Sequence, residues 1–164
     1  MRALIQRVSS ATVSIDGENL GSITTGLVVL LGVGEGDSQE DARYLVDKTL
    51  NLRVFPDDAG RFDRSLLDIN GDLLVVSQFT VYADIRKGRR PSFTAAALPE
   101  VANPLYESTV ELFKASCKNV VTGRFAEHML VDIQNDGPVT IMLDSAEREK
   151  IRDGRASPRR RCPY

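Results

Sequence analysis

The chain has 164 residues, of which 42% are hydrophobic and 27% charged, fractions typical of one globular domain that buries its own core. No apolar run approaches the roughly 18 residues that a membrane-spanning helix needs, and two cysteines are too few for a disulfide framework. We therefore expect no membrane partner and a reduced, cytoplasmic compartment. The net charge of −2 is uneven. Residues 145–164 are basic and poor in apolar side chains, so we expect one domain over residues 1–144 and a disordered tail beyond it.

The first third of the chain contains several strand patterns. Residues 2–8 and 11–15 alternate polar and apolar side chains, which predicts two short strands separated by Ser9-Ser10. Residues 20–24 predict a third strand. The continuous apolar run at residues 27–33 predicts a fourth strand that is buried on both faces.

Two helices are predicted from side chains at helical spacing. Ser38 can cap the first helix, with Asp41 at the N3 position as a weaker version of the capping box. Its apolar face consists of Ala42, Leu45, Val46, Thr49 and Leu50. Residues 99–118 predict the second helix, whose apolar stripe ends at Cys117. We interpret Cys117 as a small buried hydrophobe without a catalytic role.

Two turn sequences separate apolar runs in the rest of the chain. Asn70-Gly71 predicts a hairpin between the runs at residues 66–67 and 73–76. Residues 135–138, Asn-Asp-Gly-Pro, predict a turn between two strands at 130–134 and 139–143. Together these patterns predict an α+β fold with many short, mostly antiparallel strands and two main helices.

The usual catalytic patterns are missing from the sequence. The only histidine is His128, and no Gly-x-Ser-x-Gly motif supports it as the base of a triad. Two distant cysteines and one histidine make no zinc site, so we expect no metal and no cofactor. The glycine-rich segment at residues 32–36 lacks the spacing of a phosphate-binding loop and is better explained as a turn.

Two segments remain as candidates for chemistry. Residues 77–80, Ser-Gln-Phe-Thr, follow an apolar strand with polar groups that need partners, and a substrate in a cleft could supply them. Four basic residues, Arg86, Lys87, Arg89 and Arg90, follow within a few positions. They fit either a solvated loop tip or a loop that contacts phosphates beside a site.

With these segments, the chain resembles the D-aminoacyl-tRNA deacylase family, also called D-tyrosyl-tRNA deacylases, from Met1 to about Asp144. The resemblance rests on the opening residues 1–8, the Ser77–Thr80 block, residues 86–93 and the Asn135–Thr140 motif. It implies an enzyme that hydrolyses the ester between a D-amino acid and the terminal adenosine of tRNA, and that also accepts glycyl-tRNA. It also implies a compact fold with a barrel-like sheet, a homodimer with active sites at the interface, and a cis Gly137–Pro138 peptide bond.

The resemblance also implies roles for individual residues. The carbonyl groups around Gly137 and Pro138 would face the substrate's ammonium group and exclude an L side chain. The Phe79 backbone N–H would stabilise the oxyanion, and Ser77 and Gln78 would bind the terminal adenosine or the attacking water. Thr80 could attack the ester or orient the site, and we favour orientation, with the 2′-hydroxyl of the tRNA assisting water.

Three further residues are carried over from the family. Arg7 would brace the Gly-Pro segment, and Phe125 and Met129 would line the adenosine pocket. The chain departs from the family at Ala126, where a glycine commonly follows the Phe125 position. Two other functions stay open at this point: tRNA-end binding without hydrolysis, and hydrolysis of another small acyl ester with Thr80 as nucleophile.

Overall fold

The computed structural model describes residues 1–148, so predictions for the tail beyond Arg148 lie outside the described residues. The strands are β1 (Arg2–Ile15), β2 (Glu18–Ile23), β3 (Gly26–Gly32), β4 (Phe55–Pro56), β5 (Phe62–Arg64), β6 (Asp72–Ser77), β7 (Val120–Thr122) and β8 (Leu130–Asp144). The helices are α1 (Gln39–Asn51) and α2 (Pro99–Lys114), with a 3-10 turn, η1 (Phe79–Tyr82), between them in sequence. The predicted α+β class is confirmed.

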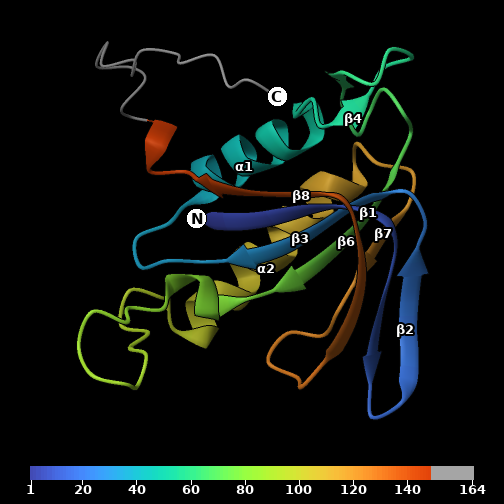
Figure 1. Cartoon of the computed structure of the whole chain (residues 1–164). Helices are drawn as coiled ribbons and strands as arrows, with labels where there is room; N and C mark the ends of the chain where they lie inside the picture. Colours follow the sequence, from blue (N-terminus) through green and yellow to red (C-terminus); the bar gives the residue numbers. More distant parts are fainter. Residues whose placement is uncertain (149–164) are drawn as a thin grey trace.

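The main sheet is mixed and strongly curved (Figure 1). One edge of β1 pairs antiparallel with β2 and β3 in succession, and its other edge pairs antiparallel with β8. β6 then pairs parallel with β3, and β7 parallel with β6. The curvature brings β2 close to β7. The distance shows this closeness, since a Cβ added to Gly21 would lie only 2.5 Å from Val121 Cγ1. This arrangement confirms the predicted barrel-like sheet.

Helices cover one face of this sheet and the curved strands close over the other. Along β3, Leu27, Val29 and Leu31 face the cluster that includes α1 and α2, whereas Val28 faces the second cluster. The side chains of β6 alternate between the same two clusters. Both faces of β3 are therefore buried, as predicted, which explains its continuous apolar sequence.

Two predicted pairs of strands are in fact single long strands. β1 runs through Ser9-Ser10, and β8 runs through the predicted turn at residues 135–138. In each case the register between β1 and β8 shifts instead of the chain reversing. A bulge moves successive side chains from one face to the other without ending the strand, so the sequence pattern at a bulge is similar to that at a turn.

The predicted hairpin at Asn70-Gly71 is also wrong. Asn70 does take a positive φ of 49°, as in a turn. However, Leu66 and Leu67 lie in the turn itself, and β6 after it pairs parallel with β3. The parallel arrangement requires a crossover, which α1 and the β4–β5 hairpin provide.

Both predicted helices form. Ser38 caps α1 and Asp41 completes a capping box, and the predicted face of α1 is buried. Cys117 follows the end of α2, where burial raises the pKa of its thiol, as expected for a packing residue. Within residues 1–148, no helix is both long and apolar enough to cross a membrane.

Candidate active site

The Ser77–Thr80 block lies where β6 ends and η1 begins. β6 is buried from Leu73 to Val76, and Ser77 is its last residue. The backbone N–H of Gln78 still bonds to Leu31 O at 2.8 Å, so the chain leaves the sheet only after this residue. η1 then turns at the surface, where Phe79 is 56% exposed. A buried strand therefore delivers the block to solvent.

This exit leaves backbone donors unused. Among the described residues, the N–H groups of Phe79 and Thr80 have no protein acceptor, since the bonds of this turn begin with the Val81 N–H donating to Gln78 O. The first N–H groups of any helical turn lack partners within it. The Gln78 side-chain amide donates to the Thr80 hydroxyl, so this hydroxyl is held within the block. Adjacent free donors can stabilise an oxyanion.

Two glycines at the end of β3 let η1 pack closely on the sheet. A Cβ on Gly32 would lie 2.4 Å from Val81 Cγ2, and one on Gly34 would lie 2.6 Å from the Tyr82 ring. The glycine-rich segment therefore allows close packing beneath the candidate site. Its residues 35–36 form a turn, as the sequence predicted.

A polar network holds η1 from the other side. Arg2 donates to Val81 O at 3.2 Å and to Asp144 at 3.0 Å, and its guanidinium lies over the Tyr82 ring. The Tyr82 hydroxyl donates to Asp37 at 3.2 Å. Burial, together with the Asp37 carboxylate, raises the pKa of Tyr82, which keeps this hydroxyl protonated. Sequence reasoning missed this support because its members come from four separate segments.

The Gly137–Pro138 step lies in a large bulge of β8. Gln6 pairs with Thr140 and Val8 with Asn135, so four residues of β8 stand opposite Arg7 alone. The Gly137–Pro138 peptide bond is cis, and Gly137 has a φ of 113° that only glycine adopts without strain. Both Gly137 and Pro138 are exposed, and their backbone groups lie outside the β1–β8 ladder.

Arg7 lies beneath this bulge. It is 7% exposed, and its Nη1 donates to Val54 O at 2.5 Å. Its Nε lies 3.0 Å from Asp136 Oδ2. The two groups form an ion pair but no hydrogen bond, and the Nε–H has no hydrogen-bond acceptor. Asn135 fixes the bulge through its side-chain amide, which donates at 3.0 Å to both Arg7 O and Val139 O. The sequence signal at Asn135 and Asp136 was interpreted only as a preference for turns.

Phe125 and Met129 lie on either side of the turn between β7 and β8. Phe125 packs against Tyr106, with ring centroids 5.9 Å apart, at the edge of the helix-facing cluster. Met129 packs in the second cluster, close to Gly123. Both side chains are partly buried, and the sole histidine, His128, is exposed. Between them, Ala126 has a φ of 62°, the conformation for which glycine is suited.

Within one chain, the Ser77–Thr80 block and the Gly137–Pro138 bulge lie far apart. Across the sheet, β1 and β3 separate β8 from β6, which amounts to about 14 Å. Along the strands, the bulge lies opposite Arg7, which pairs with Leu27, and Leu27 pairs with Leu73. Ser77 lies four residues further along β6, which amounts to about 13 Å. Measured over the surface of the sheet, the two motifs are thus about 20 Å apart. The fold brings Arg7 to the bulge and Gln78 to Thr80, but it does not join the two motifs.

No group of three or more His, Cys, Asp or Glu side chains in residues 1–148 is arranged to hold a metal ion. The Ser77–Thr80 block itself offers backbone N–H donors, two hydroxyls and one side-chain amide.

The chain is similar to known proteins over most of its length. A family model described as D-Tyr-tRNA(Tyr) deacylase matches residues 4–144. The chain is 54% identical over 145 residues to a protein of Thermosipho africanus named D-aminoacyl-tRNA deacylase, which covers 88% of this chain and 97% of the relative. It is 57% identical over 146 residues to a protein of the same name from Roseiflexus castenholzii, covering 89% and 93%.

Solved structures share the fold. The structure of a c-Myc DNA Unwinding Element Binding Protein superposes with a TM-score of 0.84 at 40% identity, covering 88% of this chain and 98% of the other. A probable eukaryotic D-amino acid tRNA deacylase gives a TM-score of 0.75 at 16% identity, with coverage of 87% and 97%, and supports the fold alone. On the family model and the identity to these relatives, the chain belongs to the D-aminoacyl-tRNA deacylase family.

Proposed function

We propose that this protein, a member of a family of ester hydrolases, hydrolyses D-aminoacyl-tRNA to free tRNA and the D-amino acid. The observation that carries the proposal is the pair of free backbone N–H groups at Phe79 and Thr80, exposed at the end of a buried strand in a chain of this family. The reaction would take place in the cytoplasm, where aminoacyl-tRNA is used.

The proposed chemistry needs no histidine. Water attacks the ester carbonyl carbon, the carbonyl oxygen becomes an oxyanion, and the Phe79 N–H stabilises this charge. The bond to the ribose oxygen then breaks, and that oxygen takes the proton that the attacking water has lost, so that the tRNA leaves with a free hydroxyl. The 2′-hydroxyl of the terminal ribose assists the water, while Ser77 and Gln78 bind the adenosine or the water. Thr80 orients the site, consistent with the hydrogen bond from Gln78 to its hydroxyl.

Chiral selection is assigned to the Gly137–Pro138 bulge. Rigid backbone carbonyls that hold the substrate's ammonium group leave room for a D side chain pointing to solvent, but an L side chain would collide with them. Such a filter is indifferent to side-chain identity, and it cannot exclude glycine, so glycyl-tRNA is also a substrate. Arg7 braces the bulge through Asp136 and the Val54 carbonyl, which supports the rigidity that the filter needs.

The filter and the catalytic block must come from two copies of the chain. A separation of about 20 Å is too large for one aminoacyl group to contact both motifs of a single chain. A symmetric homodimer solves this, because each copy can insert its bulge into the site of its partner and form two equivalent active sites. The second edge of β8 has no strand partner among the described residues, and Leu130 and Met142 expose apolar surface along it.

The terminal adenosine is assigned to the turn that carries Phe125 and Met129, whose side chains pack in the two different clusters. Aromatic and thioether side chains suit a nucleobase, since both offer polarizable apolar surface. Both side chains are partly buried, and the turn that carries them follows β7, the neighbour of β6 in the sheet. An adenine base bound at this turn is compatible with a ribose bound at the end of β6.

The test is release of amino acid from three purified substrates: D-tyrosyl-tRNA, L-tyrosyl-tRNA and glycyl-tRNA. We expect hydrolysis of the D and glycyl substrates and protection of the L substrate. No release from any of the three would reject the enzyme and leave a tRNA-end binding protein. An acyl-enzyme trapped at Thr80 would instead favour a nucleophilic esterase. Rapid hydrolysis of the L substrate would reject the chiral filter while keeping the hydrolase.

A further inference from the structure

Two exposed basic segments of this chain differ in how their charges are neutralised. On the β4–β5 hairpin and in the two residues before it, every arginine has an aspartate partner: Arg53 with Asp63, Arg61 with Asp57 and Arg64 with Asp58, at 2.6 to 2.9 Å. In the basic loop, residues 86–90, only Arg86 is paired. Among the described residues, no carboxylate lies within ion-pair distance of Lys87, Arg89 or Arg90.

Asp84, which lies just before the basic loop, holds the base of this loop in place. Asp84 receives two side-chain bonds from Arg86, at 2.9 and 2.6 Å, and these bonds lower its pKa to about 2. Asp84 also pairs with Ser92 through two backbone hydrogen bonds of 2.8 and 2.9 Å, which close the base of the loop. The closed base and the ion pair between Asp84 and Arg86 restrict the conformation of the loop. They leave Lys87, Arg89 and Arg90 at its tip.

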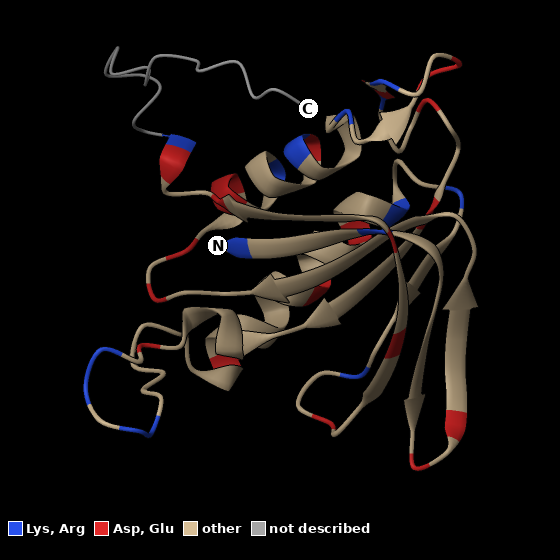
Figure 2. Ribbon diagram, viewed as in Figure 1, with Lys and Arg blue, Asp and Glu red and all other residues tan. Residues whose placement is uncertain are grey.

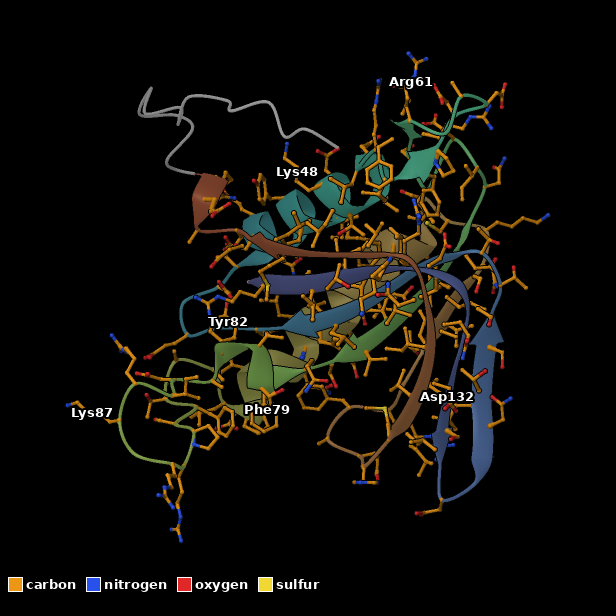
Figure 3. All side chains as sticks on the ribbon, viewed as in Figure 1. Lys48, Arg61, Phe79, Tyr82, Lys87 and Asp132 are labelled. Carbon is orange, nitrogen blue, oxygen red and sulfur yellow. The ribbon has the colours of Figure 1, made fainter. Side chains whose placement is uncertain are left out.

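The closed base places these cations beside the catalytic block. The Phe93 ring meets the Phe79 ring edge-on, with centroids 4.9 Å apart, so the base of the loop is packed against the first residue of η1. With seven residues between Asp84 and Ser92, the loop extends at most about 12 Å from its base. Figure 2 shows the basic side of this loop at one corner of the molecule, and Figure 3 places Lys87 on it, beyond Phe79.

We propose that Lys87, Arg89 and Arg90 bind the phosphates of the single-stranded acceptor end of the tRNA, next to the terminal adenosine. The proposal rests on the proposed function, because it takes the ester at Phe79 as the point from which the strand leaves. Unpaired cationic side chains beside an active site raise the affinity of the enzyme for a nucleic-acid substrate by contacting its phosphates. They do not take part in bond cleavage. The paired arginines of the β4–β5 hairpin, at the opposite corner in Figure 3, have no such role.

The experiment compares two substrates that differ in phosphates. D-tyrosyl-tRNA carries the whole acceptor strand, whereas D-tyrosyl-adenosine carries the ester and no phosphate. For the variant Lys87→Ala/Arg89→Ala/Arg90→Ala we expect KM for the tRNA substrate to rise at least about tenfold with kcat unchanged. The slope of log affinity against log salt should fall by about 2, from three lost contacts on a single strand. Hydrolysis of D-tyrosyl-adenosine should equal that of the wild type.

The matched control is Arg53→Ala/Arg61→Ala/Arg64→Ala, which removes three exposed cations that have aspartate partners. This variant should keep the wild-type KM and salt slope. A basic-loop variant with unchanged KM and slope, or equal losses on both substrates, would overturn the proposal.

If the wild type hydrolyses neither substrate, the proposed function fails, and the loop is judged by binding of uncharged tRNA instead. In that assay a Kd weakened at least about tenfold by the basic-loop variant, and not by the control, supports the phosphate contacts. An equal Kd rejects them.

Discussion

The Ser77–Thr80 block and the Gly137–Pro138 bulge are both exposed, but they are built in opposite ways. The block lies at the end of a buried strand, is supported from beneath by close packing against Gly32 and Gly34, and presents unused N–H donors. The bulge lies in the middle of β8 and is held by side chains, chiefly Arg7 and Asn135. Donors suit a developing negative charge, whereas a braced, carbonyl-rich bulge suits a cation.

On this contrast we propose that one motif carries the chemistry and the other the selection, and that the two motifs of one site come from different copies of the chain. Variants of the two motifs should therefore fail in different ways. The following predictions test the division in order of decreasing effect.

The largest effect is expected from removing the Phe79 N–H. Phe79 is the first residue of η1, a position at which proline is tolerated because its missing N–H has no partner within the turn. Phe79→Pro should lower kcat by about 10²- to 10³-fold, the usual cost of losing one oxyanion donor. Phe79→Ala keeps the N–H and serves as the control for loss of the ring. Equal losses in kcat for the two variants would show that the N–H has no special role.

Gly137→Ala should follow, through crowding of the bulge. An added Cβ would lie 2.7 Å from Arg7 Nη2 and 2.9 Å from Val139 Cγ2, at a φ of 113°. Displacement of the carbonyls by about 1 Å is expected to cost about 100-fold in kcat/KM on D-tyrosyl-tRNA. The control is Gly60→Ala, which has a φ of 78° but no atom within 4 Å of the added Cβ. It should lose stability and keep activity, and similar activity losses in both would point to a general effect of backbone strain.

Thr80→Ala should have a small effect on catalysis. If the hydroxyl only orients the site through Gln78, kcat should fall by less than about tenfold, below the contribution of a general acid–base group. Steady-state kinetics on D-tyrosyl-tRNA provide the measurement. A fall comparable with that of Phe79→Pro would identify Thr80 as the nucleophile and reverse the division of roles.

The smallest effect concerns stability alone. Ala126 occupies a left-handed conformation that disfavours a Cβ, so Ala126→Gly should raise the free energy of unfolding by about 0.5 to 1 kcal/mol. Ala59→Gly, in another turn but with an ordinary φ, should lower it by a similar amount. Urea denaturation measures both, and destabilisation by Ala126→Gly would show that packing of the Ala126 methyl outweighs the strain.

Sequence patterns predicted the elements that depend on local physics. The capping box at Ser38, the two apolar helix faces and the double burial of β3 all follow from periodicity and side-chain type. The bulges in β1 and β8 could not be predicted, because a bulge and a turn share the same residue preferences and differ only in where the chain pairs next. The hairpin prediction at Asn70-Gly71 was wrong for the same reason, since these two residues favour a turn but do not determine which strand β6 pairs with.

The candidate site divides in a similar way. Ser77–Thr80 and Gly137–Pro138 stand out as motifs, and the family resemblance supplied their roles. The residues that support them, such as Tyr82, Asp37 and Asp136, show no signal of their own, because their importance depends on contacts between segments distant in sequence.

The most direct test of a site shared between two copies is a mixture of two defective variants. Phe79→Pro and Gly137→Ala are unfolded, mixed in equal amounts and refolded, and hydrolysis of D-tyrosyl-tRNA is measured. In a random mixture of symmetric dimers, half are mixed, and each mixed dimer has one site with an intact block and an intact bulge, so about a quarter of wild-type activity should return. Activity no higher than the average of the two variants alone would contradict a site built from two chains.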